Sequence, residues 1–425
     1  MLSIKIKSVV KLFIMLVLVV TFINTKTNAQ GKNTISPCPV DADIWVLAGQ
    51  SQMAGAGRTP DTLTDSRIIM LNMDNKWITA KNPLHRIFEA AAPAYESNFI
   101  ELLPDSSKAN AHEQFKLLSE MSKKSPVGGV GPGLYFAQKI LNETGRPVAL
   151  IPCALGGSKM DMWYPSKLSM GDESLYGAMI DRVKAAGVNK VKGMLWSQGE
   201  SEAMLQNTSN YEADLINLIE SFRRDINRPD LPVILVQSGR FLRVDLKEGR
   251  SWESLRDIQR RVCKKVKNVY MTSGIDLPLD DCAHISTDGQ RVLGKRLAEI
   301  ALTYVYNLPG HAQQIELESI TLKKDDASGS NYLLLHYSGV CGKLQAKGRP
   351  SDFEIRVDGE PKIEYVASKV EFDPVDEAGL RVFLSMLPPE GATLVCGAGT
   401  NPYMNITDSL NNPVPAFGPV GIPVK

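Results

Sequence analysis

The sequence lacks several features that mark common classes of protein. Its 48 Lys and Arg residues nearly balance 47 Asp and Glu residues, so there is no excess charge to attract nucleic acid or an anionic membrane. The six cysteines include no Cys-x-x-Cys pair and the five histidines no His-x-x-x-His pair, so neither a zinc site nor a redox dithiol is indicated. Beyond the N-terminus, no apolar run is long enough to span a membrane. We therefore expect a neutral substrate, no metal and no other cofactor.

Residues 1–29 have the pattern of a signal peptide. Three lysines precede an apolar run over residues 12–23, and the small residues at 27–29 resemble a cleavage site. The run is short for a membrane span, although an uncleaved N-terminal anchor is the alternative. Either way, the mature protein is expected outside the cytoplasm, in the periplasm or secreted.

Residues 40–308 alternate short apolar runs, rich in β-formers, with amphipathic stretches. This pattern is typical of βαβ units around a parallel sheet, and continuous apolar strands indicate helices on both faces. Residues 72–129 show little periodicity and are expected to form a long loop excursion near the active site. The expected strands are 44–48, 67–71, 148–153, 191–196, 233–237 and 268–272, and the expected helices are 132–142, 211–225, 252–266 and 287–306.

The pattern changes after the sequence Asn-Leu-Pro-Gly at 307–310, which ends the last of these helices. Residues 312–425 contain alternating apolar and polar segments separated by Gly, Pro, Asp and Ser, which predicts a small all-β accessory domain. Cys341 and Cys396 both lie there. They either form a disulfide or pack as small buried thiols.

Ser51 is the candidate nucleophile. It lies in the segment Gly-Gln-Ser-Gln-Met at 49–53, where the first expected strand turns into the next element. Open α/β sheets bind ligands at the carboxyl ends of their strands, which is where this hydroxyl falls. A serine in an ordinary strand-to-helix turn is the alternative, so the interpretation requires a base.

Asp281 and His284 provide a candidate base. An Asp three residues before a His can accept the Nδ1 proton, which leaves Nε2 to deprotonate a serine. Asp280, four residues before His284, is the alternative partner if the loop is helical.

Two further strand ends offer donors for an oxyanion hole. Gly156 and Gly157 follow the strand at 148–153, and Gln198 follows the strand at 191–196. Glu200 is close to Gln198 and either orients it, contacts substrate or is a plain turn carboxylate.

The motifs at residues 49–53, 156–158, 196–200 and 281–284, in this order along the chain, resemble the sialate O-acetylesterase and carbohydrate esterase family 6 branch of the SGNH hydrolases. The resemblance implies a flavodoxin-like three-layer sandwich with a central parallel sheet. It also implies hydrolysis of short acyl esters, chiefly acetyl, on carbohydrates such as O-acetylated sialic acid or acetylated polysaccharide. A non-catalytic carbohydrate-binding protein on the same fold is the alternative.

The resemblance also implies roles for single residues. Ser51 would be the nucleophile, and Asp281 and His284 would complete its triad. The oxyanion hole would combine the N–H groups of Ser51 and of Gly157 or Gly156 with the Gln198 amide. Gln50, Gln52, Gly156 and Glu200 are possible substrate or supporting contacts, and Gln52 departs from the Asn usual in the family.

Overall fold

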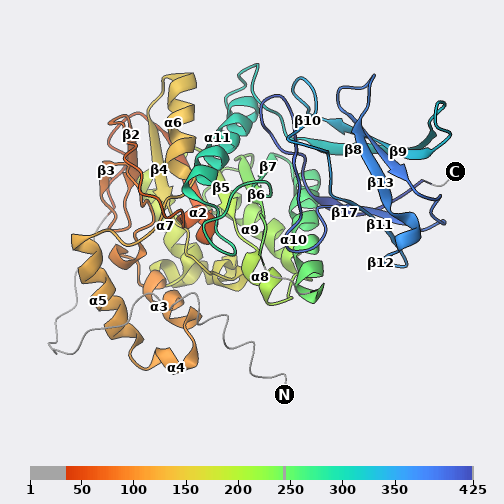
Figure 1. The fold of residues 1–425 in the computed structure, drawn as a ribbon. Coiled ribbons are helices and arrows are strands. Elements are labelled where there is room, and N and C mark those ends of the chain that lie inside the picture. Colours follow the sequence, from red (N-terminus) through yellow and green to blue (C-terminus); the bar gives the residue numbers. More distant parts are fainter. Residues whose placement is uncertain (1–34, 243–245, 424–425) are drawn as a thin grey trace.

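The central sheet of the computed structural model has seven strands in the order β3-β2-β4-β1-β5-β6-β7 (Figure 1). The structure describes residues 35–242 and 246–423, so the expected signal peptide lies outside the described residues. All neighbouring strands are parallel except β3, which runs antiparallel to β2 at one edge. The strands are β1 (Asp43–Gly49), β2 (Ile68–Leu71), β3 (Trp77–Thr79), β4 (Val148–Pro152), β5 (Val191–Ser197), β6 (Val233–Gln237) and β7 (Val269–Ser273).

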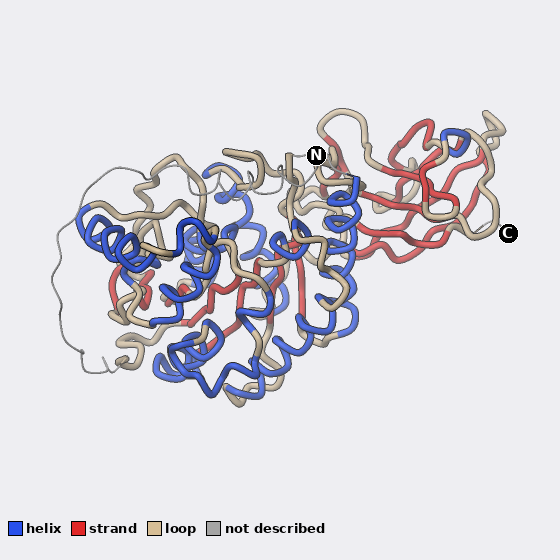
Figure 2. Tube along the Cα trace, turned by 90° about the horizontal axis from the view of Figure 1, so that it is seen from below, coloured by secondary structure: helices blue, strands red, loops and turns tan. Residues whose placement is uncertain are grey.

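Helices cover both faces of this sheet, as Figure 2 shows. Along β1 the side chains of Ile44, Val46 and Ala48 enter one hydrophobic cluster, while Trp45 and Leu47 enter the other. The strands β4-β1-β5-β6-β7 follow the flavodoxin-like order 2-1-3-4-5, which confirms the expected α/β class. The main helices are α6 (Gly133–Thr144), α7 (Leu175–Gly187), α8 (Glu200–Met204), α9 (Tyr211–Asp225), α10 (Leu246–Lys265) and α11 (Thr287–Tyr304).

The prediction of a long loop at residues 72–129 was wrong. Besides β3 it contains α3 (Pro93–Leu102), α4 (Asp105–Lys108) and α5 (Ala111–Lys124). Phe88, Phe99 and Phe115 pack together with ring centroids 5.2–5.7 Å apart, so an aromatic cluster of its own orders this segment. These contacts join residues distant in sequence and leave no clear local period.

The C-terminal part is all-β, as expected. One antiparallel sheet has the order β13-β14-β9-β8 and a second the order β12-β11-β15-β17, with a separate two-stranded pair β10-β16. All six cysteines are free thiols, so Cys341 and Cys396 do not form a disulfide. The strands are β8 (Glu316–Lys324), β9 (Asn331–Ser338), β10 (Gln345–Ala346), β11 (Phe353–Val357), β12 (Glu360–Pro361), β13 (Ala367–Phe372), β14 (Gly379–Leu384), β15 (Thr393–Cys396), β16 (Ile406–Thr407) and β17 (Phe417–Gly421).

The change from α/β to β structure falls between the end of α11 and the start of β8. Among the helices of residues 35–242 and 246–423, none has the length and apolar character to cross a membrane.

Candidate active site

Three of the sequence motifs meet at the carboxyl edge of the sheet. β1 lies between β4 and β5, so the turns after these strands are neighbours. The approach of β1 to β5 requires glycine at position 49, whose φ is +119° and whose added Cβ would lie 2.1 Å from the Ser197 carbonyl oxygen. The next residue, Gln50, donates its N–H to the same oxygen at 2.7 Å. The turn that bears Ser51 is therefore fixed to β5.

Ser51 begins the short helix α2 (Ser51–Ala54) and is half-buried. A Cβ placed on Gly156 would be 3.7 Å from the Ser51 Cβ, so the turn after β4 faces the serine across a small gap. Gly157 has a φ of +74°, which favours glycine. Within the described ranges, no group accepts a hydrogen bond from the N–H of Ser51 or of Gly157. Both donors remain available to a ligand.

Asp281 and His284 form the expected pair. His284 Nδ1 lies 2.9 Å from Asp281 Oδ2 and 3.1 Å from Oδ1, and Oδ1 also accepts the N–H groups of Ala283 and His284 at 2.9 Å each. Partial burial acts to raise the pKa of Asp281, but these hydrogen bonds outweigh it and lower the pKa to about 2. The carboxylate therefore stays ionised at neutral pH.

Asp280 has a different partner. Its Oδ2 accepts the Arg58 N–H at 2.8 Å, while the Arg58 guanidinium lies 3.2 Å from Asp281 Oδ2. Sequence reasoning missed Arg58, and no local signal marks it because the contacts span more than two hundred residues.

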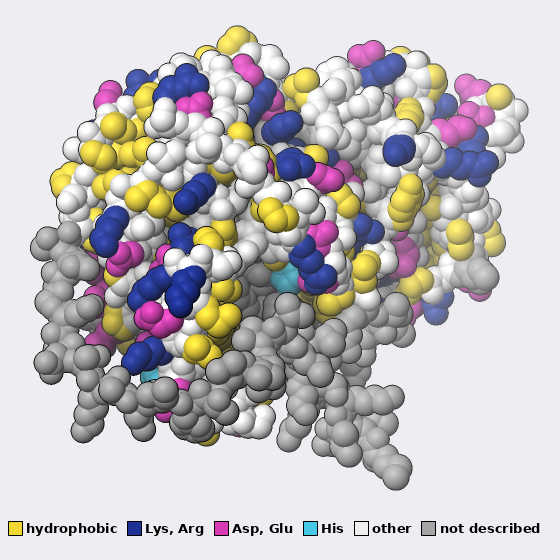
Figure 3. All heavy atoms as spheres, turned by 60° about the vertical axis from the view of Figure 1, so that its left-hand side comes forward, with side chains coloured by type: hydrophobic (Ala, Val, Ile, Leu, Met, Phe, Trp, Pro, Cys, Tyr) yellow, Lys and Arg dark blue, Asp and Glu magenta, His cyan; other side chains and the backbone are white. Residues whose placement is uncertain are grey.

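Gln52 joins the nucleophile turn to the histidine loop. Its side chain is buried, donates from Nε2 to the Ala283 carbonyl at 2.7 Å and accepts the Ile285 N–H at 3.2 Å. These two groups flank His284, and Gln52 directly follows Ser51. The contact brings the imidazole loop and the serine turn together. On the face of the molecule that Figure 3 shows, basic, acidic and hydrophobic side chains are interspersed.

Gln198 lies at the expected strand end but is fully buried. Its Nε2 is 3.2 Å from the Ser158 carbonyl oxygen and 2.5 Å from Glu202 Oε2. Both amide hydrogens thus have acceptors within the protein. Sequence reasoning missed Glu202, which also accepts the Met160 N–H and so ties α8 to the segment after β4.

Gln50 and Glu200 occupy the interior behind the site. Gln50 Oε1 accepts the N–H groups of Gly199 and Ser201 at 3.3 and 3.4 Å, so this side chain braces the turn after β5. The Glu200 carboxylate is buried beside Ser238, and no described residue meets its oxygens in good hydrogen-bonding geometry. Burial raises the pKa of Glu200 from 4.5 to about 7. Over the described residues, no three His, Cys, Asp or Glu side chains gather as a metal site.

The sheet order and the motifs at its carboxyl edge are those of the SGNH type of α/β fold. The chain belongs to the family "Carbohydrate esterase, sialic acid-specific acetylesterase", whose model matches residues 41–303. The resemblance drawn from the sequence is thereby confirmed, and the protein is a carbohydrate esterase by family.

Two similar proteins extend this comparison. Over 276 residues the chain is 30% identical to the probable carbohydrate esterase At4g34215 of Arabidopsis thaliana, covering 63% of this chain and 93% of that protein. A solved structure, the carbohydrate acetylesterase XAC1771 from Xanthomonas citri, aligns with a TM-score of 0.59 at 19% identity. That alignment covers 88% of this chain and 80% of the other, so the likeness in fold extends beyond the α/β part.

Proposed function

We propose that this protein is a serine esterase that removes acetyl and other short acyl groups from carbohydrate hydroxyls, as in O-acetylated sialic acid or acetylated polysaccharide. One observation carries the proposal: the Asp281–His284 pair is held by Gln52 against the turn that bears Ser51. A nucleophile, a base and a carboxylate that orients the base are the parts that acyl transfer requires. We also propose that the enzyme works outside the cytoplasm, as the N-terminal pattern predicts.

In the first half of the proposed cycle, His284 Nε2 takes the Ser51 proton while the hydroxyl oxygen attacks the ester carbonyl. Asp281 holds the Nδ1 proton and stabilises the imidazolium that forms. The tetrahedral intermediate then collapses, and His284 returns the proton to the sugar oxygen, which leaves as the alcohol. In the second half, water attacks the acyl-serine by the same route, and acetate and free Ser51 are released.

The N–H groups of Ser51 and Gly157 are the proposed donors to the oxyanion, because both lack an acceptor within the described protein. Gln198 is the third donor implied by the resemblance. To join them, its amide would break its hydrogen bond to the Glu202 carboxylate and donate to the oxyanion instead. Until then it braces the turn of Gly157 through Ser158.

A carbohydrate-binding protein without chemistry is the competing proposal. Binding alone does not require a histidine held in one tautomer by a carboxylate, and the Asp281–His284 geometry therefore favours the esterase.

Acetate release decides between the two. The full-length mature protein and its Ser51→Ala variant are incubated with O-acetylated sialic acid, acetylated xylan and other acetylated glycans. We expect acetate from at least one glycan with the wild type and none above background with the variant, whose circular dichroism should be unchanged. Binding of a glycan without release of acetate would contradict the proposal and favour the binding protein.

A further inference from the structure

We infer that the C-terminal β structure positions the catalytic loop, and is not a separable carbohydrate-binding module. The inference rests on the proposed function, since it concerns the loop that bears Asp281 and His284. Three sets of contacts join the β structure to the connection between β7 and α11, which carries that loop: one is direct, and two pass through α11 or through the segment after β6.

The first contact is apolar. Ile275, two residues after β7, is completely buried and belongs to the hydrophobic cluster of the β structure, together with residues such as Leu333 and Leu394. It does not pack in either cluster of the central sheet. The connection therefore begins inside the core of the β structure.

The second contact is polar and lies one residue further on. Asp276 receives two hydrogen bonds of 2.7 Å each from the buried guanidinium of Arg296 in α11. The same guanidinium donates to the Asn411 carbonyl at 2.8 Å, from the loop after β16. A planar fork can serve both partners in one orientation only, so the β loop fixes Arg296 and, through it, Asp276.

The third contact reaches the catalytic loop itself. Leu242 donates its N–H to the Cys282 carbonyl at 2.7 Å, and Phe241 donates to the Thr400 carbonyl at 2.8 Å. Phe241 and Leu242 lie in the segment that follows β6. This segment therefore connects Thr400 of the β structure to Cys282, the residue next to Asp281.

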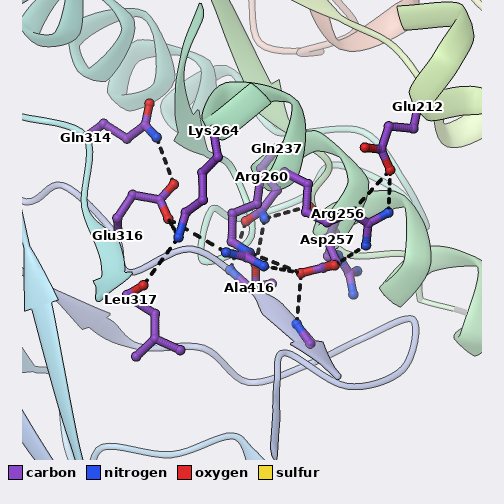
Figure 4. A network of polar contacts seen from close by, with 12 residues as sticks. Glu212, Gln237, Arg256, Asp257, Arg260, Lys264, Gln314, Glu316, Leu317 and Ala416 are labelled. Carbon is purple, nitrogen blue, oxygen red and sulfur yellow. Dashed lines mark hydrogen bonds and ion pairs between the residues drawn. The ribbon is translucent and has the colours of Figure 1, made fainter. Parts of the chain in front are cut away.

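Arg256 joins the α/β part to the β structure. It is fully buried in α10 and donates to five carbonyls, those of Ser238 and Gly239 after β6 and of Gly397, Gly399 and Thr400 after β15. The surrounding interface is polar as well: Figure 4 shows the buried side chains of Gln237 with Ala416 and of Arg260 with Glu316, whereas Lys264, which also contacts Glu316, is exposed. Buried polar groups of this kind are costly unless paired, so the two parts gain stability only in this relative position.

Gln52 contacts the same loop from the nucleophile turn. The loop that bears the imidazole is therefore held from two sides, by the nucleophile turn and by the β structure. Release of the second side would let His284 move relative to Ser51, and a misplacement of ~1 Å costs on the order of 10² in rate.

The test compares Arg256→Lys with Lys264→Met in the full chain. Lysine keeps the charge but cannot reach five carbonyls. Lys264, about two turns further along α10, is exposed, and among the described residues its polar contacts across the interface are with Glu316 and the Leu317 carbonyl only. For a short aryl acetate we expect Arg256→Lys to lower kcat roughly 10- to 100-fold with KM nearly unchanged. The rate of Ser51 labelling by a fluorophosphonate should fall in parallel. Lys264→Met should keep kcat and the labelling rate, and wild-type values for Arg256→Lys would overturn the inference.

A thermal scan of the unaltered protein covers the case in which Arg256→Lys does not fold. We expect one cooperative transition, with esterase activity lost in step with the unfolding of the β structure. A β structure that unfolds first while activity persists would overturn the inference. Ser51→Ala is assayed in parallel: if it keeps activity the proposed function fails, whereas an inactive Ser51→Ala beside a fully active Arg256→Lys refutes only the positioning role.

Discussion

Asp281 and Asp280 are neighbours in the sequence, but their carboxylates have different partners. Asp281 holds His284 Nδ1, whereas Asp280 accepts the backbone N–H of Arg58. We expect Asp281→Asn to lower kcat by about 10²- to 10⁴-fold, because an amide neither fixes the tautomer nor stabilises the imidazolium. Asp280→Asn should stay within a few-fold of wild type. Assay of both variants with one acetyl ester at neutral pH checks this, and a larger loss at Asp280 would reverse the assignment.

Gln52 holds the histidine loop through a side chain of a particular length. Asparagine, one methylene shorter, cannot reach the Ala283 carbonyl and the Ile285 N–H together, so Gln52→Asn should lower kcat roughly 10-fold or more with little change in KM. Gln314→Asn makes the same change away from the site, where the side chain joins Met271 and Glu316. Equal kcat values for the two variants would show that these two hydrogen bonds of Gln52 do not position His284.

Glu200 makes stability depend on pH. Its pKa is about 4.5 when exposed and about 7 when buried, so its contribution to stability is full below pH 4.5 and is lost as the pH rises through 7. Glu200→Gln should therefore raise the free energy of unfolding at pH 8, by on the order of 3 kcal/mol, and change it little at pH 4. Urea unfolding at the two pH values measures the difference. An equal gain at both values would exclude ionisation as its cause.

At the scale of elements, the site depends on how closely β1 approaches β5. A methyl group at position 49 would collide with the Ser197 carbonyl, so Gly49→Ala should cost at least about 3 kcal/mol. Gly145, which follows the last residue of α6, also has positive φ, but no atom lies within 4 Å of where its Cβ would be. Gly145→Ala should therefore lower the free energy of unfolding by only about 1–2 kcal/mol. Equilibrium unfolding of both variants separates backbone strain from strand packing, and similar losses would contradict the proposed collision.

Elements with a strong local pattern could be predicted from the sequence. β6 matched its expected range, and α9 did so as well, because apolar runs and a 3.6-residue period mark them. β3 could not be predicted, since its three residues, two half-buried and one exposed, lie at a sheet edge and leave no period. The spacing of Asp281 and His284 also predicted their contact, which is local. The hydrogen bond between Gln52 and the Ala283 carbonyl joins residues 231 positions apart, so no local sequence signal marks it.

At the scale of the whole molecule, the sequence predicted an all-β C-terminal part but not its contacts with the rest of the chain. Arg256 lies in a stretch expected to be an amphipathic helix, where a charged residue normally faces solvent. In the structure it is fully buried between the two parts. Only the fold brings the carbonyls of Gly397, Gly399 and Thr400 to this helix, so the role of the β structure follows from the three-dimensional arrangement.

The most direct test of the central claim is to trap Ser51. The protein is treated with a fluorophosphonate, and the adduct is located by mass spectrometry of its peptides. We expect one adduct, on Ser51, formed in step with loss of acetyl-ester hydrolysis, absent from Ser51→Ala and much slower in His284→Ala. An adduct on another residue, or continued hydrolysis by the fully labelled protein, would contradict the account.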